Sequence, residues 1–306
     1  MIVVFGSVNI DLIFDVPTLP RPDETVLGTA YTVMPGGKGA NQAVAAARDG
    51  ARVAFLGCVG RDAFGQLARG SLAAAAVDIG GLAEVETPTG CAAICVDASG
   101  RNQIAVASGA NRDASAAQVP DAALTGTSTA ILQMEVPADE VAALIARARV
   151  RGSRTVLNLA PALPLEQRVL AAVDVLVVNE GEAAALAGAQ RIALTEPVPL
   201  VRALADLLGN TVVITLGSLG SVAARPGETW AVDALQIKTV DTTGAGDAYV
   251  GVLAAALDRG AALPEALHRA SVAGGLACLK PGAQPSLPIK AAIDARLSDL
   301  PPARRL

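Results

Sequence analysis

Residues 241–247 combine glycines with carboxylates in a spacing that suits chemistry on an anionic substrate. They read Asp-Thr-Thr-Gly-Ala-Gly-Asp and precede an alanine-rich run, residues 250–257, that is typical of a helix. Glycines let the backbone approach a ligand, and the free N–H groups of a helix N-terminus attract an anion. Asp247, in the first turn of that helix, would lie beside the anion as a base that takes a proton from an attacking hydroxyl. A glycine turn with a capping aspartate is the alternative interpretation.

A second glycine-rich stretch, residues 35–41, reads Pro-Gly-Gly-Lys-Gly-Ala-Asn and precedes a helical run over residues 42–48. Its glycine spacing excludes a Walker phosphate-binding loop, as does Gly39, which follows Lys38 where that loop has Ser or Thr. Three glycines within four positions destabilise a fold unless the backbone needs them. We therefore expect Lys38 and Asn41 to face a ligand.

Two pairs of polar residues are spaced so that each pair shares a face. Asn9 and Asp11 follow an apolar strand-like run, and alternation along an extended chain would point both side chains the same way. An amide and a carboxylate together suit the hydroxyl groups of a sugar, although a polar strand end facing water has the same pattern. Asn179 and Glu182 lie three residues apart at a predicted helix start, where they could approach a hydrated Mg²⁺ or simply cap the helix.

Two loops have the composition of nucleotide or cation contacts. Residues 215–220 form a glycine turn after a predicted strand, which suits nucleotide phosphates or ribose. Residues 280–286 form a polar loop after a small-residue helix, and it could cover an adenine or hold a cation. Either segment, taken alone, would also be an ordinary turn.

The elements that must position these residues alternate between apolar strands and amphipathic helices. Strands are predicted at residues 2–5, 53–59, 130–133, 155–158, 175–178 and 212–215, and in a run through Ile237 and Val240. Helices include residues 64–76, 138–148 and 200–208. This alternation predicts an α/β fold, a doubly wound, mostly parallel sheet with helices on both faces. Because sites in such sheets gather at the carboxyl ends of the strands, we expect one shared edge for Glu135, Asn158, Asn179, Thr215 and the stretch from Asp241.

A second set of β segments interrupts this alternation. Residues 90–97 and 102–108 alternate in polarity around a turn of the hairpin type, and shorter β-like runs occur near residues 12–16 and 29–33. These four segments predict a small discontinuous β-sheet that projects from the main domain as a lid. No linker or repeat divides the chain, so residues 1–306 are expected to form one domain with this lid.

Composition excludes several classes of protein. Hydrophobic residues make up 52% of the 306 residues, mean hydropathy is +0.46, and the net charge is −5 with no basic block. This argues against nucleic acid or an anionic membrane as a partner. Four cysteines and one histidine do not have zinc-ligand spacing, and the cysteines are expected to be reduced thiols of a cytoplasmic protein. No apolar run reaches the roughly 18 residues of a membrane helix.

The two glycine-rich stretches together resemble the two signatures of the ribokinase-like (PfkB) family of sugar kinases. Asn179 with Glu182, the turn at residues 215–220 and the loop at residues 282–286 follow in the family's order, so that the likeness spans essentially the whole chain. Within the family, the chain is most similar to the members that phosphorylate ribose. The resemblance implies transfer of a phosphoryl group from ATP to the 5-hydroxymethyl group of D-ribose, with Mg²⁺ and K⁺ as cofactors, and a homodimer formed through the lid.

The resemblance also implies a role for individual residues. The sugar hydroxyls would be held by Asn9, Asp11, Gly37, Lys38, Asn41 and Glu135. Asp247 would be the base, and the transferring phosphoryl group would meet the amides of Gly244, Ala245 and Gly246. ATP would contact Asn179, Thr215, Gly217, Gly220 and Ser271, with Glu182 near Mg²⁺. A monovalent cation would lie among Asp241, Thr243, Ala277, Lys280, Gly282 and Ser286, partly through backbone carbonyls. Ser271 and the Lys280-Pro281 pair depart from the usual family residues.

Two alternative functions remain open on the sequence. A sister kinase of the same fold could act on fructose, deoxyribose or a nucleoside such as adenosine. A binding protein without catalysis would have no need for Asp247 or the intact glycine turn. A dinucleotide oxidoreductase is excluded, because the third glycine of its fingerprint would fall at Tyr249.

Overall fold

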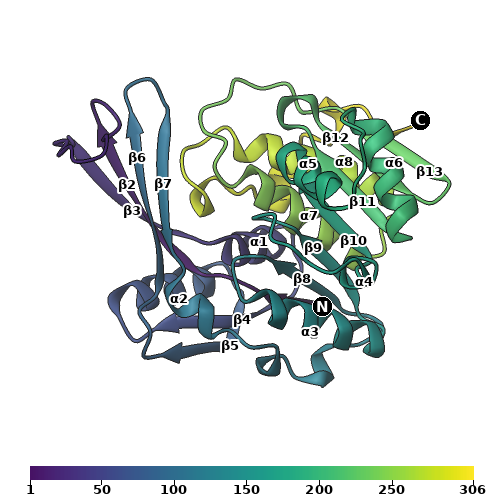
Figure 1. Ribbon diagram of the computed structural model, residues 1–306, viewed down its shortest axis with the longest axis horizontal. Coiled ribbons are helices and arrows are strands. Elements are labelled where there is room, and N and C mark those ends of the chain that lie inside the picture. Colours follow the sequence, from purple (N-terminus) through teal and green to yellow (C-terminus); the bar gives the residue numbers. More distant parts are fainter.

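A ten-stranded sheet forms the centre of the computed structural model, which describes residues 1–306 (Figure 1). Its order is β14-β13-β12-β11-β10-β9-β8-β1-β4-β5. The parallel strands are β1 (Ile2–Phe5), β4 (Val53–Gly60), β5 (Asp78–Val85), β8 (Thr129–Gln133), β9 (Arg154–Asn158), β10 (Val175–Asn179) and β11 (Thr211–Thr215). One end is antiparallel: β12 (Ser221–Arg225), β13 (Glu228–Val232) and β14 (Arg304–Arg305).

Helices cover both faces of this sheet and form two separate hydrophobic cores. One core holds β-strand residues such as Ile2 and Val4 with α1 (Lys38–Arg48), α2 (Ala63–Ala74), α7 (Ala245–Asp258) and α8 (Leu263–Ala277). The other holds Val3 and Phe5 with α3 (Ala138–Arg151), α4 (Gln167–Leu170), α5 (Glu180–Ala189) and α6 (Pro197–Leu208). Successive side chains of β1 therefore point into opposite cores, as expected for a strand that is buried on both faces. The predicted fold class is confirmed.

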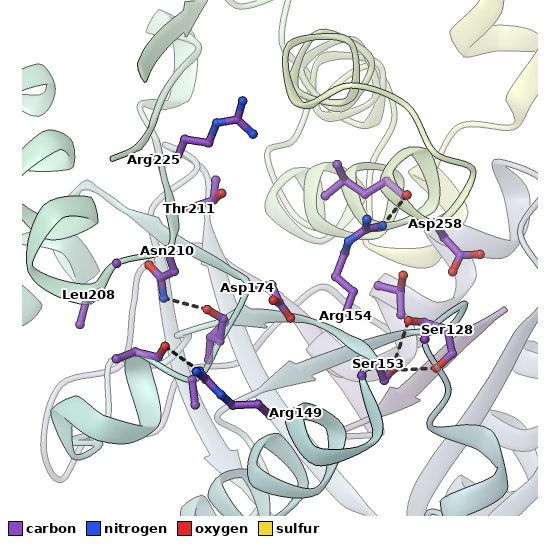
Figure 2. A pocket seen from close by; sticks show the side chains of 18 of the residues that line it. Ser128, Arg149, Ser153, Arg154, Asp174, Leu208, Asn210, Thr211, Arg225 and Asp258 are labelled. Atoms are coloured by element: carbon purple, nitrogen blue, oxygen red, sulfur yellow. Dashed lines mark hydrogen bonds between the residues drawn. The ribbon is translucent and has the colours of Figure 1, made fainter. Parts of the chain in front are cut away.

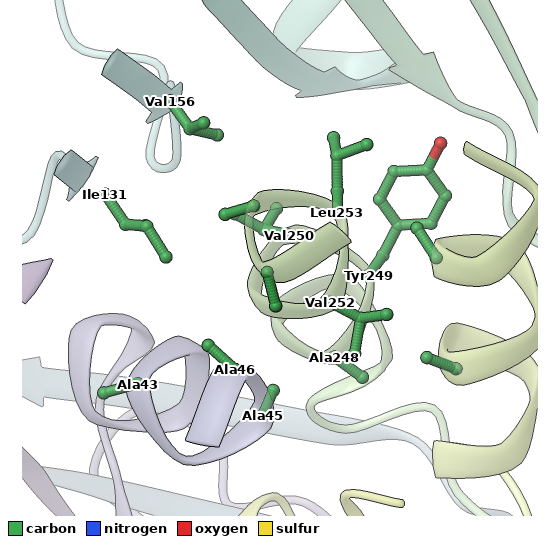
Figure 3. Packing of buried hydrophobic residues seen from close by; sticks show 14 of the residues in the cluster. Ala43, Ala45, Ala46, Ile131, Val156, Ala248, Tyr249, Val250, Val252 and Leu253 are labelled. Carbon is green, nitrogen blue, oxygen red and sulfur yellow. The ribbon is translucent and has the colours of Figure 1, made fainter. Parts of the chain in front are cut away.

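Small residues line the contact between α1 and α7 (Figure 3). Ala45 and Ala46 on α1 face α7, and a Cβ atom added at Gly251 would lie 2.5 Å from the carbonyl oxygen of Gln42. Glycine and alanine at a helix contact allow the two backbones to approach. This approach brings the N-terminal half of α1 within hydrogen-bonding reach of Asp247.

A separate four-stranded sheet, with order β3-β2-β6-β7, stands out from the main body (Figure 1). Its strands are β2 (Asn9–Val16), β3 (Ala30–Gly36), β6 (Gly90–Asp97) and β7 (Asn102–Ala107). β2 pairs with β3 in antiparallel register, so that Asp11 lies opposite Met34. Asn9 and Asp11 share one face of β2 at the end nearest the main sheet.

Several elements differ from their predictions. Residues 233–240 form no strand: the N–H of Val240 donates to the carbonyl of Cys278, and Ile237 packs against the core from a loop. The helix predicted from residue 42 begins at Lys38, and β5, β12 and β13 were not anticipated. All four cysteines are free thiols. None of the helices combines the length and the apolar character that a membrane span requires.

Candidate active site

Asp247 lies in the first turn of α7, buried to 8% exposure, and both of its carboxylate oxygens accept hydrogen bonds. Asn41 Nδ2 donates to Oδ2 and Gln42 Nε2 donates to Oδ1, each at 2.9 Å. Burial raises the pKa of Asp247, while Lys38 and the two amide donors oppose that shift. A raised pKa in a carboxylate that stays anchored is suited to accepting a proton.

The glycine turn before Asp247 offers backbone N–H groups. Gly244 is the N-cap residue of α7 with φ of 77°, a left-handed conformation that glycine adopts without strain. The N–H of Ala245 donates to the carbonyl of Thr242 at 3.2 Å, whereas the N–H groups of Gly244 and Gly246 have no acceptor. Two of the three predicted amides are therefore free to bind an anion at the helix N-terminus.

Lys38 begins α1 among carboxylates. Its N–H donates to Glu135 Oε2 at 3.0 Å, and Ser7 Oγ donates to the same oxygen at 2.6 Å. Burial lowers the pKa of the Lys38 ammonium. The negative charges of Asp247, Glu135 and Glu182 together raise this pKa by more, so that the net shift is upward. Lys38 therefore stays protonated and provides the positive charge of the site.

The predicted sugar-binding residues meet where β2 leaves the main body. Gly37 has φ of 88°, and a Cβ atom there would lie 2.6 Å from the backbone nitrogen of Asn9, so only glycine fits. Asn9 Oδ1 accepts from Asn111 Nδ2 at 2.8 Å. Burial, with Glu135 and Asp247 nearby, raises the pKa of Asp11 from 3.8 to about 6. The Oδ1 atom of Asn41 is buried without a partner and could accept a ligand hydroxyl.

A cavity of about 590 Å³ adjoins the glycine turn of α7. Its lining includes all five residues predicted for ATP, namely Asn179, Thr215, Gly217, Gly220 and Ser271. Ser271 Oγ is buried and lacks a hydrogen-bond partner. Cavities of roughly 300–1,000 Å³ with few polar groups are typical of small-ligand sites, and an unpaired hydroxyl in the wall fits a polar ligand such as a nucleotide.

Asn179 and Glu182 form a capping box at the start of α5. Asn179 Oδ1 accepts from the N–H of Glu182 and Glu182 Oε2 accepts from the N–H of Asn179, both at 2.8 Å. Glu182 also lines a smaller cavity of about 220 Å³ with Lys38 and Asp247, and burial raises its pKa. No group of three His, Cys, Asp or Glu side chains is arranged for a metal. The donor set fits a magnesium ion that keeps most of its waters.

The predicted cation residues lie in the loop before α7 and in the segment from the end of α8 to Ser286, and hydrogen bonds of Asp241 join the two. Asp241 Oδ1 accepts from the N–H and hydroxyl of Thr243, and Oδ2 accepts from the N–H of Gly282 at 2.7 Å. These hydrogen bonds outweigh burial and lower the pKa of Asp241. Ser286 is buried, and its hydroxyl donates to the Ala283 carbonyl. Ala277 ends α8. The side chain of Lys280 is exposed and ends in a positively charged donor, so that any cation contact from Lys280 would come from its backbone carbonyl.

Sequence reasoning missed the polar side chains beneath the site. Gln42 is fully buried and bonds Asp247, Asn158 and Gln133, which come from three different elements. The sequence signal that could have identified Gln42 was its position, directly after Asn41 at the start of an otherwise alanine-rich run. A buried side-chain amide needs hydrogen-bond partners, and the sequence alone does not identify partners that lie far away along the chain.

A cavity of about 980 Å³ lies at the opposite edge of the sheet, at the amino ends of β8, β9 and β11 (Figure 2). It contains none of the predicted site residues. Arg154 donates to the Leu257 carbonyl and Arg149 to the Ala171 carbonyl. Asp258 pairs with the N-terminal ammonium. Because these charged groups already have protein partners, the chemistry is expected at the carboxyl edge.

Comparison with known proteins agrees with this geometry. The model of the pfkB family of carbohydrate kinases matches residues 1–290. The ribokinase of Haemophilus influenzae is 36% identical over 290 residues, which cover 94% of this chain and 95% of that protein. The fold is similar to that of the Thermotoga maritima ribokinase, with a TM-score of 0.91, 30% identity and coverage of 97% and 99%.

A second solved structure, the Arabidopsis thaliana ribokinase complexed with ribose and ATP, has a TM-score of 0.86 and 30% identity, with coverage of 97% and 98%. The family model and the relatives extend over nearly the full chain, including the glycine turn of α7, the N-terminus of α1 and the separate small sheet. The chain belongs to the pfkB family of carbohydrate kinases.

Proposed function

We propose that this kinase transfers the γ-phosphoryl group of ATP to the 5-hydroxymethyl oxygen of D-ribose. The observation that supports this most directly is the placement of Asp247, a buried carboxylate beside two free backbone N–H groups and the Lys38 ammonium. Phosphoryl transfer depends on positioning and on compensation of charge, and this arrangement supplies both. The named ribokinases among the relatives favour ribose as the acceptor.

In this proposal, each part of the site has one task. Asn9, Asp11, Gly37, Lys38, Asn41 and Glu135 hold the sugar hydroxyls. Asp247 accepts the proton of the reacting hydroxyl, while the amides of Gly244 and Gly246 face the transferring group. Thr215, Gly217, Gly220, Asn179 and Ser271 line the space for ATP. Bound Mg²⁺ would neutralise phosphate charge, with Glu182 as the nearest carboxylate, and K⁺ would lie at the loops joined by Asp241.

The small sheet is proposed to act as a lid and as the contact of a homodimer. Asn9 and Asp11 begin β2, so that movement of this sheet would cover the sugar and exclude water. Tyr31, Ile104 and Val106 are each more than half exposed on it, and exposed apolar side chains favour association. Sedimentation that remained monomeric at every protein concentration would contradict the dimer.

The experiment that tests the function measures ADP release with ATP, Mg²⁺ and ribose, 2-deoxyribose, fructose, adenosine or no acceptor. We expect release that depends on ribose and falls by about 10²–10⁴-fold in Asp247→Asn, the range expected for loss of a general base. Preference for another acceptor would retain the mechanism and overturn the ribose assignment. Activity of Asp247→Asn close to wild type would overturn the assignment of the base.

A further inference from the structure

Gln42 is a fully buried side chain on α1 whose single amide group joins Asp247 to the central sheet. Its Nε2 donates to Asp247 Oδ1 at 2.9 Å and to Asn158 Oδ1, at the end of β9, at 3.0 Å. Its Oε1 accepts from Gln133 Nε2, at the end of β8, at 2.7 Å. Both hydrogens on nitrogen and the oxygen are therefore engaged with groups on three other elements.

The orientation of the Gln42 amide is fixed by these neighbours. Asn158 Nδ2 donates to the Val177 carbonyl at 3.2 Å, which leaves the Asn158 oxygen directed at Gln42. A reversed Gln42 amide would place its oxygen against two other oxygens, those of Asn158 and Asp247. A buried acceptor facing acceptors loses its hydrogen bonds, so that Gln42 holds an N–H toward the carboxylate.

We propose that Gln42 is the positioning residue of the phosphoryl-transfer base, an inference that rests on the proposed function. Its hydrogen bond commits Oδ1 of Asp247 to the protein interior. Oδ2 instead accepts from Asn41, which belongs to the proposed sugar site and has a buried, unpaired Oδ1 of its own. Oδ2 is therefore the oxygen that accepts the proton, and Gln42 holds it in place without touching either substrate.

The proton and the electrons follow directly from this assignment. The O–H bond of the hydroxymethyl group breaks and its proton passes to Asp247 Oδ2. The same oxygen forms a bond to the γ-phosphorus of ATP, and the bond between that phosphorus and the bridging oxygen breaks with its electron pair going to ADP. Asp247 must be ionised beforehand, and an N–H donated to a carboxylate favours its ionised form.

The charged groups acting on Asp247 come from four elements and do not include Gln42. They are Lys38 on α1, Glu135 after β8, Asp11 on β2 and Glu182 on α5. Replacing Gln42 by a neutral residue leaves this set of charges unchanged. A change in the ionisation of Asp247 in such a variant therefore reports the lost hydrogen bond.

The test compares Gln42→Met with Gln133→Met through kcat and KM for the sugar between pH 5 and 9. Both variants replace a buried glutamine by a side chain of similar length, but only the first removes the donor to Asp247. We expect the acidic limb of kcat for Gln42→Met to move up by about one pH unit, so that kcat falls by up to about tenfold at pH values below the limb and much less at pH 9. For Gln133→Met we expect no movement of the limb, and for both variants a sugar KM within about twofold of wild type.

An equal fall of kcat at all pH values in both variants would show that Gln42 is only structural and would overturn the inference. If Gln42→Met does not fold, Gln42→Glu keeps the shape and places a second carboxylate beside Asp247, which is expected to move the acidic limb further up. An unmoved limb in a folded Gln42→Glu would also overturn it. Loss of activity in Asp247→Asn, together with an unmoved limb in the Gln42 variants, would reject this inference and leave the proposed function intact.

Discussion

The parallel sheet has a cavity at each edge, and the two differ in how their charges are compensated. At the amino edge, the cavity of about 980 Å³ has Arg154 donating to a helix carbonyl and Asp258 paired with the N-terminal ammonium. At the carboxyl edge, the cavities are smaller, about 590 and 220 Å³. There the pKa values of Asp11, Glu182 and Asp247 are all raised, first by burial.

In this comparison, carboxylates whose ionisation is disfavoured by burial mark the candidate site, whereas the size of a cavity does not. A fold tolerates carboxylates in an environment that disfavours their ionisation only where something else requires them, and such groups cluster at active sites. Strand direction gives the same answer, since ligands of open α/β sheets bind at the carboxyl ends of the strands. The predictions below test whether the two edges differ as sharply in function as they do in charge.

The largest effect on kcat is expected when the ammonium group of Lys38 is removed from the carboxyl edge of the sheet. Lys38→Met leaves Glu135, Glu182 and Asp247 without the positive charge that they share. We expect kcat to fall by about 10²–10³-fold, the cost of losing one preorganised electrostatic contact. The remaining activity should have its acidic limb at higher pH, because Lys38 lowers the pKa of Asp247.

The control for that experiment lies at the amino edge. Arg154→Met also removes a cation, but one whose partner is the carbonyl of Leu257 at the far end of α7. Steady-state kinetics of this variant should match wild type within about twofold, with a loss of unfolding free energy of about 1 kcal/mol. A similar loss of kcat in both variants would mean that the two edges are not functionally distinct.

Most of the fold could be predicted because its signals are local. The apolar runs of β1, β8, β10 and β11 and the two glycine turns lie within short windows of sequence. The run through Ile237 and Val240 misled because it has the apolar composition of a strand but no strand to pair with: Val240 is 63% exposed and its N–H bonds a helix end. The added hairpin of β12 and β13 was missed because it depends on a free sheet edge beside β11.

The glycines and charged residues of the candidate site could be predicted from the sequence, whereas the amide side chains that support them were harder to predict. Asn41 and Asp247 stood out through the motifs that contain them. Gln42 did not, because its partner Asp247 is 205 residues away and only the close approach of α1 to α7 at Gly251 brings the two together. Long-range packing decides which buried polar residues meet, and a single sequence does not contain that information.

An effect of intermediate size is expected on the free energy of unfolding, which should rise for a change at the carboxyl edge and fall for a change at the amino edge. The pKa of Asp11 is about 6 in the fold and 3.8 ordinarily, so that the folded state binds a proton more tightly than the unfolded state between these values. Ionisation of Asp11 therefore destabilises the folded state. This destabilisation is absent at pH values below the two pKa values and complete at pH values above them. Asp11→Asn should raise the free energy of unfolding at pH 7 by about 1–2 kcal/mol, and this gain should shrink toward pH 4.5.

The matched change at the amino edge is Asp174→Ala. Asp174 Oδ2 accepts from the N–H and the hydroxyl of Thr155, so its removal should lower the unfolding free energy by about 1–3 kcal/mol at pH 7. Urea unfolding at both pH values measures the two variants. Asp11→Asn should also raise KM for the sugar, whereas Asp174→Ala should not. Destabilisation by both changes at pH 7 would show that Asp11 is as well compensated as Asp174.

The smallest effect is expected for Arg225→Gln in the wall of the amino-edge cavity. Arg225 is exposed, pairs with the partly buried Glu228 in the same hairpin, and lies 5.3 Å from the centre of the Trp230 ring. Exposed ion pairs contribute about 0–1 kcal/mol, so that the unfolding free energy should change by less than about 1 kcal/mol and kcat and both KM values should remain at wild type. A change of KM for ATP or sugar by tenfold or more would show that the amino-edge cavity takes part in the reaction, and the contrast between the edges would then have to be drawn from strand direction alone.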